Sequence, residues 1–182
     1  MSLVSLARGA PAPAMRPAFA GLALVAALVL TLLAPAFAAD GSIVVTLKQV
    51  SSDRYLDAWD DGTNDFGVVT RPSQNNNSQL WRITWIDSGI GTLQQLSTGR
   101  FLDAHEITGK DFQLVTRPEQ GNTTQNWSFV AVGGGLYAIE QLSSKRFIDA
   151  HEIAERDFAV VTRPRQDNNT QLWELVIIEK AK

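Results

Sequence analysis

The chain has 182 residues, with 16 basic and 19 acidic side chains and a formal net charge of −3 at pH 7. This length suits one domain, and a mildly acidic chain without a run of lysine or arginine is poorly suited to bind nucleic acid or anionic lipid. Because the chain contains no cysteine, disulfides, thiolate metal sites and cysteine nucleophiles are excluded.

Residues 1–39 differ in composition from the rest of the chain. Their only charges are Arg8 and Arg16, and an apolar run over residues 21–33 precedes an Ala-x-Ala step that ends at Ala38. A basic start, an apolar run of this length and such a step are typical of a secretory signal peptide. The sequence therefore predicts a signal peptide over residues 1–39 with cleavage near Ala38, and a retained membrane anchor is the alternative.

The mature chain would then cover residues 40–182. Translation of the precursor would start at Met1 or Met15. Removal of two arginines leaves 14 basic against 19 acidic residues, a net charge near −5. We expect a secreted or periplasmic protein that is monomeric and has no contact with the membrane after cleavage.

One unit of 46 residues occurs three times without insertion, over about residues 43–88, 89–134 and 135–180. The positions identical in all copies include the tryptophan of a Gln-x-Trp step, the aspartate of an Asp-Ala step, an Arg-Pro pair and an Asp-Phe pair. The tryptophans are Trp81, Trp127 and Trp173, and the Asp-Phe pairs begin at Asp65, Asp111 and Asp157. One unit of this size cannot bury its own apolar face, so the copies should share a core.

Each copy divides at turn signals into four strands. In the second copy these are expected at residues 92–96, 100–104, 112–117 and 125–130, and Pro118 ends the third because proline has no N–H for a ladder. Short strands separated by turns at this spacing indicate an all-β sandwich or barrel. No helical period persists in the mature chain, so long helices are not expected.

The repeated steps resemble those of the ricin B-type lectin domain, which is a β-trefoil. They are Gln79-Leu-Trp81, Gln125-Asn-Trp127 and Gln171-Leu-Trp173, together with a Leu/Ile-Asp-Ala step in each copy. The resemblance covers residues 40–182 and implies an all-β fold, a β-trefoil of three repeats with four strands each. It also implies that the tryptophans build a common core, that the glutamines hold nearby backbone, and that the partner is a carbohydrate bound without cofactor or metal ion.

The resemblance further implies a shallow sugar pocket in each repeat. In the family an aspartate accepts hydrogen bonds from sugar hydroxyls, an aromatic ring stacks on the sugar, and a nearby asparagine completes the polar contacts. The aspartate transfers to Asp57, Asp103 and Asp149. A structural ion pair with the arginine of the same repeat is the alternative role, and both roles can hold together. These arginines are Arg71, Arg117 and Arg163.

The stacking ring of the family does not transfer. Strand alternation along residues 66–71 predicts that Phe66 and Val68 point inward and that Val69 points toward the pocket, but this position is not aromatic in any copy. The nearest rings follow the Asp-Ala step, and packing on their own hairpin is their alternative role. They are Trp59, His105 and His151, and the polar position beside this strand is Gln113 in the second copy.

The family's asparagine before Gln-x-Trp is also replaced, by serine or threonine. Asparagines two places earlier could take over its role, although turn formation is the favoured interpretation because asparagine hydrogen-bonds its own backbone. These residues are Asn76, Asn122 and Asn168.

Two functions follow from the sequence. The first is a lectin-like module that binds carbohydrate through up to three equivalent shallow pockets. The second is a non-catalytic protein-interaction scaffold or inhibitor, which the missing stacking ring favours. Catalysis is not expected, because candidate carboxylates recur once per copy rather than as a facing pair; they are Asp60, Glu106 and Glu152.

Overall fold

A computed structural model describes residues 41–180 and contains β-strands and one-turn 3-10 helices in this range. The predicted signal peptide and its cleavage site lie outside the described residues. No helix between residues 41 and 180 has the length and apolar character needed to cross a membrane.

Each repeat contributes four strands, in the order that the sequence predicts. Repeat 1 contains β1 (Ser42–Gln49), β2 (Tyr55–Ala58), β3 (Val68–Arg71) and β4 (Trp81–Asp87). Repeat 2 contains β5 (Ile90–Gln95), β6 (Phe101–Ala104), β7 (Leu114–Arg117) and β8 (Trp127–Gly133). Repeat 3 contains β9 (Leu136–Gln141), β10 (Phe147–Ala150), β11 (Val160–Arg163) and β12 (Trp173–Lys180).

Two one-turn helices occur in each repeat, one in each of the loops that flank its third strand. They are η1 (Gly62–Asn64), η2 (Asn77–Gln79), η3 (Thr108–Lys110), η4 (Thr123–Gln125), η5 (Ala154–Arg156) and η6 (Asn169–Gln171). The expected all-β trefoil of three repeats with four strands each is confirmed.

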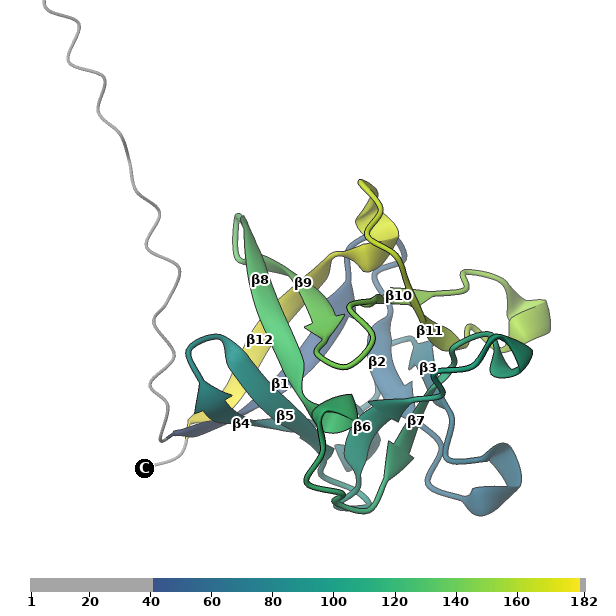
Figure 1. Ribbon diagram of the computed structural model, residues 1–182, viewed down its shortest axis with the longest axis horizontal. Helices are drawn as coiled ribbons and strands as arrows, with labels where there is room; N and C mark the ends of the chain where they lie inside the picture. Colours follow the sequence, from purple (N-terminus) through teal and green to yellow (C-terminus); the bar gives the residue numbers. More distant parts are fainter. Residues whose placement is uncertain (1–40, 181–182) are drawn as a thin grey trace, which may run out of the picture. The chain divides into compact units, whose positions relative to one another are not determined.

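Six strands form a closed antiparallel barrel, in the order β1–β4–β5–β8–β9–β12 and back to β1. The other six form the hairpins β2–β3, β6–β7 and β10–β11, which lie on the right in Figure 1 while the barrel lies on the left. Closure pairs strands that would otherwise present open edges to other chains.

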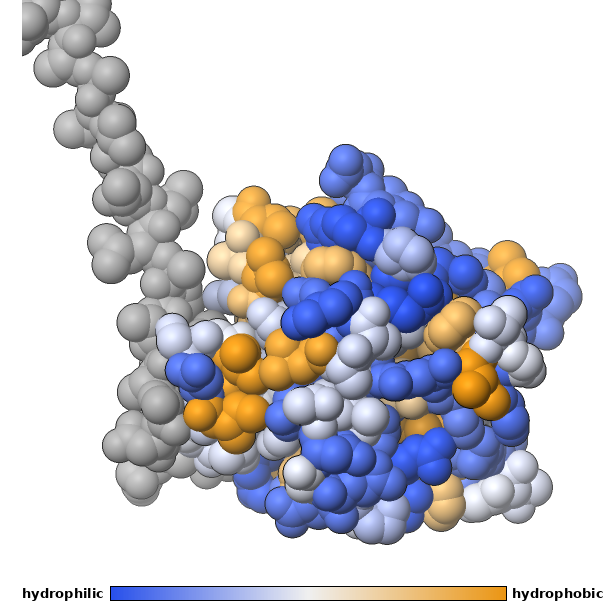
Figure 2. Space-filling model, viewed as in Figure 1, coloured by the Kyte–Doolittle hydropathy of each residue, from blue (hydrophilic) through white to orange (hydrophobic). Residues whose placement is uncertain are grey.

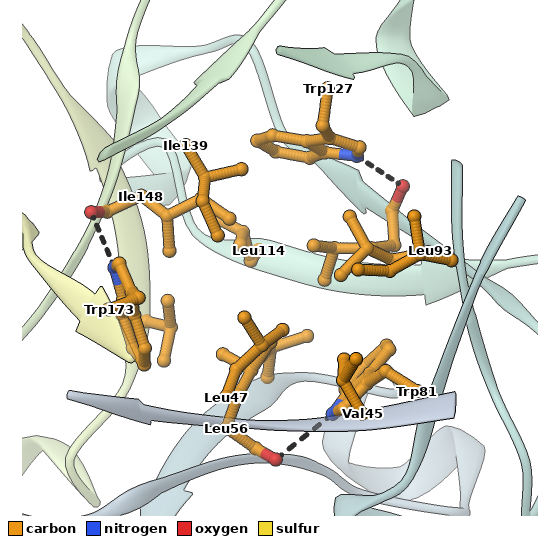
Figure 3. Close-up of a cluster of buried hydrophobic side chains, with 14 of the residues drawn as sticks. Val45, Leu47, Leu56, Trp81, Leu93, Leu114, Trp127, Ile139, Ile148 and Trp173 are labelled. Carbon is orange, nitrogen blue, oxygen red and sulfur yellow. Dashed lines mark hydrogen bonds between the residues drawn. The ribbon is translucent and has the colours of Figure 1, made fainter. Parts of the chain in front are cut away.

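The three Gln-x-Trp tryptophans are fully buried and surround the core (Figure 3). Their indole N–H groups donate to the backbone carbonyls of Leu56, Leu102 and Ile148 at 3.0, 3.1 and 3.2 Å. Each tryptophan therefore ties a barrel strand to the hairpin of its own repeat, and the predicted common core is confirmed.

The three hairpins are joined in a ring by the phenylalanine of the Asp-Phe pair. Each Phe carbonyl accepts a hydrogen bond from a threonine N–H of another repeat, at 2.9–3.0 Å. Each Phe ring also lies under an arginine guanidinium of that repeat, at 3.7–3.8 Å. The stacked pairs are Phe66 with Arg100, Phe112 with Arg146, and Phe158 with Arg54.

The predicted alternation along residues 66–71 is wrong at Phe66. Asp65 and Phe66 both have positive φ, 54° and 51°, so strand β3 begins only at Val68. Val68 enters the core as predicted, whereas Phe66 is half-buried against Arg100. The left-handed step turns the Phe out of its own repeat and into the ring of hairpins.

The same prediction is wrong at Val69, which does not open toward a pocket. Its side chain is only 2% exposed, because the ring of hairpins brings its backbone into a bridge with Ala159 of repeat 3. Val115 and Val161 are buried in the same way. The position where the family would carry a stacking ring is therefore covered in this protein.

Candidate functional site

Each repeat buries one aspartate in the first strand of its hairpin, and the two carboxylate oxygens have separate partners. In repeat 1, Asp57 Oδ1 accepts from the N–H of Ala58 at 2.8 Å and Oδ2 accepts from Gln79 Nε2 at 3.2 Å. The same contacts recur at 2.7–2.8 and 3.4–3.5 Å in the other repeats. The aspartates Asp57, Asp103 and Asp149 are only 2–3% exposed.

The glutamine of Gln-x-Trp fastens the loop before it. Gln79 Nε2 also donates to the carbonyl of Pro72 at 2.9 Å, and its Oε1 accepts from the N–H of Gln74 at 2.8 Å. Gln125 and Gln171 make the corresponding bonds. The expected role of these glutamines in holding nearby backbone is confirmed.

The arginine of each repeat stands over the buried aspartate, as the structural interpretation predicts. The Nε–Oδ2 distances are 4.0, 3.7 and 4.0 Å for Arg71, Arg117 and Arg163 with their own aspartates. These pairs are too long for direct hydrogen bonds. The guanidinium groups therefore remain available to other partners.

A carboxylate from another repeat completes the site in repeat 1. Trp59 donates from its indole N–H to Asp157 Oδ2 at 3.2 Å, and the Arg71 guanidinium lies 4.3 Å over the Trp59 ring. Arg71 Nη2 also reaches Asp157 Oδ2 at 3.5 Å. Trp59 thus has one ring face covered by Arg71 and remains partly exposed.

Repeats 2 and 3 place histidine where repeat 1 has tryptophan. His105 Nε2 bonds to Asp65 at 3.0 Å while its Nδ1 lies 3.2 Å from Arg117 Nη2. His151 Nε2 bonds to Asp111 at 2.7 Å. Aspartate, ring and arginine therefore lie together in these repeats, with an additional aspartate from the preceding repeat.

Two of the cross-repeat aspartates, Asp65 and Asp111, have lowered pKa values. The hydrogen bond from His105 is the main cause that holds the pKa of Asp65 below its ordinary value. For Asp111, burial raises the pKa, but the hydrogen bond from His151 and the charge of Arg163 outweigh it, so the pKa is lowered. Sequence reasoning missed these residues as part of the site, although the threefold identity of the Asp-Phe pair was a signal for them.

An open hollow of about 470 Å³ lies over repeat 1. It brings together four predicted site residues, namely Asp57, Trp59, Arg71 and Asn76. Asp60 and Asp61 also line it, and Ser97 enters from repeat 2. This hollow therefore combines a partly exposed ring with carboxylate, amide and hydroxyl groups.

The hollow over repeat 2 is smaller, about 270 Å³, and its lining differs. It contains Asp103, His105 and Arg117 from the prediction, and the exposed Ile107 stands where repeat 1 has Asp61. Gln113 is not part of this lining; its amide faces Gly67, within the ring of hairpins.

The asparagines hydrogen-bond within their own loops, but the backbone bond of the turn interpretation is present only in repeat 2, where Asn122 Oδ1 accepts from the N–H of Thr124 at 3.2 Å. Asn76 Oδ1 accepts from the hydroxyl of Ser78 at 2.8 Å, and its Nδ2 donates to Gln74 Oε1 at 2.8 Å. Asn122 and Asn168 form the equivalent pair of bonds. Asn76 nevertheless lines the hollow of repeat 1.

The carboxylates that recur once per repeat join neighbouring repeats. Asp60 accepts a hydrogen bond from the Ser97 hydroxyl at 2.9 Å, and Glu106 and Glu152 accept from Ser143 and Ser51. Among residues 41–180, no cluster of three or more histidine and acidic side chains is arranged to hold a metal ion.

Comparisons with known proteins agree with this architecture. The family described as "Ricin-type beta-trefoil lectin domain-like" matches residues 36–115 and 77–162. The sequence has no significant match among curated proteins.

Several solved structures are similar. An exo-β-1,3-galactanase from Clostridium thermocellum has a TM-score of 0.65 and 21% identity, over 75% of this chain and 30% of that one. The Rhizoctonia solani agglutinin has a TM-score of 0.64 and 22% identity, over 79% and 99%. The Polyporus squamosus lectin, bound to Neu5Acα2-6Galβ1-4GlcNAc, has a TM-score of 0.63 and 14% identity, over 75% and 49%.

Identities this low show the fold alone. The family match, in contrast, spans more than half of the sequence and includes complete copies of the Gln-x-Trp and Asp-Ala steps whose contacts are described above. The chain therefore belongs to the ricin-type β-trefoil lectin domain-like family.

Proposed function

We propose that this protein binds carbohydrate and that the hollow over repeat 1 is its main site. The observation that carries the proposal is the convergence of Trp59 with carboxylate, amide and hydroxyl side chains on one open space of about 470 Å³. Small-molecule sites of a few hundred Å³ with a small number of converging polar groups are common in proteins.

The chemistry of this hollow suits a sugar. The aromatic surface of Trp59 that Arg71 leaves open can cover C–H groups of a pyranose ring, and ionised carboxylates make strong hydrogen bonds to hydroxyls. Asp60 and Asp61 are exposed at the rim, whereas the buried Asp57 forms the floor. The rim carboxylates and Asn76 are therefore proposed to contact the ligand directly, and Asp57 to position Arg71.

The three repeats are not proposed to contribute equally. His105 and His151 replace Trp59 and bond to aspartates of the preceding repeats, and the hollow over repeat 2 is about 270 Å³. A histidine held in this way offers less ring surface for stacking. Repeats 2 and 3 would add weak secondary binding at most, which gains avidity only on a dense glycan surface.

We also propose that the protein acts outside the cytoplasm and has no catalytic activity of its own. The composition of residues 1–39 supports the secreted or periplasmic location. The once-per-repeat carboxylates each accept a hydrogen bond from a neighbouring repeat, which supports a binding role rather than hydrolysis.

The test is a glycan array followed by titration calorimetry with the sugars it selects. Galactose, β-1,3-galactan fragments and sialyl-N-acetyllactosamine are the first probes, because the similar structures include a galactanase and a sialoglycan-bound lectin. Replacing Trp59 by histidine copies the residue of the other repeats and should weaken binding about tenfold, the equivalent of about 1.4 kcal/mol. Ser128→Ala, on β8, is the control. An array without any signal, or equal affinities for wild type and Trp59→His, would refute the proposal.

The scaffold hypothesis has one supporting observation. Ile86, Val132 and Ile178 occupy equivalent positions in the three repeats and are 51%, 41% and 55% exposed. Figure 2 shows apolar residues gathered over the hairpins β4–β5 and β8–β9. A silent array together with a stable protein partner that is lost on replacement of these residues by serine would favour this function.

A further inference from the structure

A second groove lies beside the hollow of repeat 1. Its volume is about 380 Å³, and its apolar side consists of Tyr55 from β2, Leu80, and Val176 and Ile178 from β12. Its polar side is the loop of residues 73–77. This groove could not be predicted from the repeat pattern, because β12 belongs to repeat 3.

One loop separates the groove from the hollow that contains Trp59. Gln74, Asn76 and Asn77 line both spaces, so the two are adjacent across a single wall. The wall is anchored from below, because the buried Gln79 holds the N–H of Gln74 and also donates to Asp57 on the floor of the hollow. The two spaces are therefore held in a fixed relation by one hydrogen-bonded unit.

The wall carries four amide side chains in succession, all exposed to solvent, from Gln74 to Asn77. Gln74 and Asn76 bond to each other, while the side chains of Asn75 and Asn77 form no hydrogen bond with other residues between 41 and 180. An amide offers both a donor and an acceptor, which matches a sugar hydroxyl. These two side chains are free to bind a ligand that passes over the wall.

The groove also offers apolar surface beside these amides. Tyr55 is partly exposed, and Val176 and Ile178 are 39% and 55% exposed. The Tyr55 hydroxyl makes no hydrogen bond within the described part of the chain. The groove therefore places a ring with an unbonded hydroxyl and unbonded amide side chains around one space.

The other repeats lack this combination. Repeat 2 has Gly121 and Thr123 at the positions of Asn75 and Asn77. Repeat 3 has a related groove of about 310 Å³, but Asp167 replaces Asn75 and Arg165 lines the space. Tyr55 itself is replaced by phenylalanine in both repeats.

We propose that repeat 1 binds an extended oligosaccharide, with one end in the Trp59 hollow, a middle section over the amide wall and the following residues in the Tyr55 groove. This inference rests on the proposed carbohydrate binding at repeat 1. It adds that the ligand class is a glycan chain of several residues rather than a single terminal sugar.

The experiment is calorimetry with ladders of β-1,3-galacto-, β-1,4-xylo- and α-1,4-gluco-oligosaccharides, from the monosaccharide to the hexasaccharide. In at least one ladder, affinity should rise about tenfold between the disaccharide and the tetrasaccharide and then level off. Asn75→Ala and Tyr55→Ala should each lower the affinity for the tetrasaccharide to about the affinity for a sugar that occupies the hollow alone. The ratio of tetrasaccharide to monosaccharide affinity should therefore fall. Thr123→Ala, in the equivalent loop of repeat 2, is the control and should leave this ratio equal to that of the wild type.

Asn75 lies on the surface of a loop, so Asn75→Ala reports on binding even if Tyr55→Ala disturbs the β2 strand. A flat ladder that still loses affinity in Trp59→His would overturn the extended site and leave the proposed function standing. A chain-length gain that survives both groove substitutions would also overturn it. Absence of binding throughout every ladder would overturn both proposals.

Discussion

Glutamine and tryptophan of the Gln-x-Trp step act on different parts of the repeat although only one residue separates them. Gln79 ends the one-turn helix η2 and holds the loop backbone, whereas Trp81 begins β4 and enters the core. Because the chain changes from helix to strand at Leu80, the two side chains point to different surroundings, the loop backbone and the core. The pair thereby fixes the loop wall of the proposed site to the centre of the fold.

Truncation of a core tryptophan should be strongly destabilising. Trp81→Ala removes a fully buried ring and its hydrogen bond to Leu56, so the free energy of unfolding should fall by about 3–5 kcal/mol. Trp59→Ala, at a partly exposed position, should cost far less. Urea unfolding followed by circular dichroism measures both, and equal losses would contradict the assigned positions.

The acidity of Asp65 and Asp111 makes stability dependent on pH. Their pKa values are lowered in the folded protein, so they contribute stability at pH values above the ordinary aspartate pKa of 3.8, and this stability is lost as the pH falls through that value and below it. Their side chains are 56% and 43% exposed, so solvent screening limits the combined effect to about 1 kcal/mol.

Urea unfolding between neutral pH and pH 3 compares the wild type with the Asp65→Asn/Asp111→Asn variant. The variant should be less stable at neutral pH and should lose less stability on acidification. Parallel pH profiles would show that these carboxylates do not gain interactions on folding.

At the level of elements, the hairpins are interlocked rather than simply adjacent. Two successive non-glycine residues in the left-handed region, such as Asp65 and Phe66, are uncommon and direct a phenylalanine to the neighbouring repeat. Its ring lies under Arg100, whose pKa is lowered by burial. The contact is therefore partly desolvated, which strengthens a cation–π interaction.

A double-mutant cycle tests this interlock. Phe66→Ala and Arg100→Ala should show a coupling energy of about 0.5–1 kcal/mol, because they remove the same stacked contact. Phe112→Ala combined with Arg100→Ala is the matched control, since Phe112 stacks on Arg146 instead. A coupling equal to that of the control would contradict the interlock.

The sequence predicted the order of the strands well, and less well the starts of the third and fourth strands. The fourth strand of the second copy was expected from Gln125, but Gln125 ends η4 and β8 begins at Trp127. The second copy was expected to have a strand over residues 112–117, but β7 covers Leu114–Arg117. No glycine or asparagine marks the left-handed step at Asp111, so the local sequence reads as continuous strand. The burial of Val69 was missed for a different reason, because it depends on the bridge to Ala159 in the hairpin of repeat 3.

Among the site residues, Asp57, Trp59, Arg71 and Asn76 could be predicted because one repeat contains them all. Ser97 could not be assigned, because it reaches the hollow of repeat 1 from repeat 2. Asp157 could not be assigned either, because it contacts Trp59 and Arg71 from repeat 3. The hollows of repeats 1 and 2 also differ in size, about 470 and 270 Å³, and only repeat 1 has a tryptophan directly after its Asp-Ala step. Threefold sequence similarity therefore predicted the architecture but overestimated the equivalence of the sites.

At the scale of the molecule, the barrel closes only when all three repeats are present. β5 pairs with β8, β8 with β9, and β12 returns to β1, so removal of repeat 3 opens the barrel. Residues 41–134 alone should therefore show no cooperative unfolding as a monomer. Size-exclusion chromatography and urea titration measure this, and a monomeric fragment with a sharp transition would contradict the shared core.

The most direct measurement of the central claim is a ¹H–¹⁵N titration that follows the indole N–H signals of the five tryptophans as a sugar selected on the array is added. Carbohydrate bound in the hollow of repeat 1 should shift the Trp59 signal in proportion to occupancy, while the buried Trp81, Trp127 and Trp173 remain unchanged. Saturable binding that leaves the Trp59 signal in place would contradict the claim.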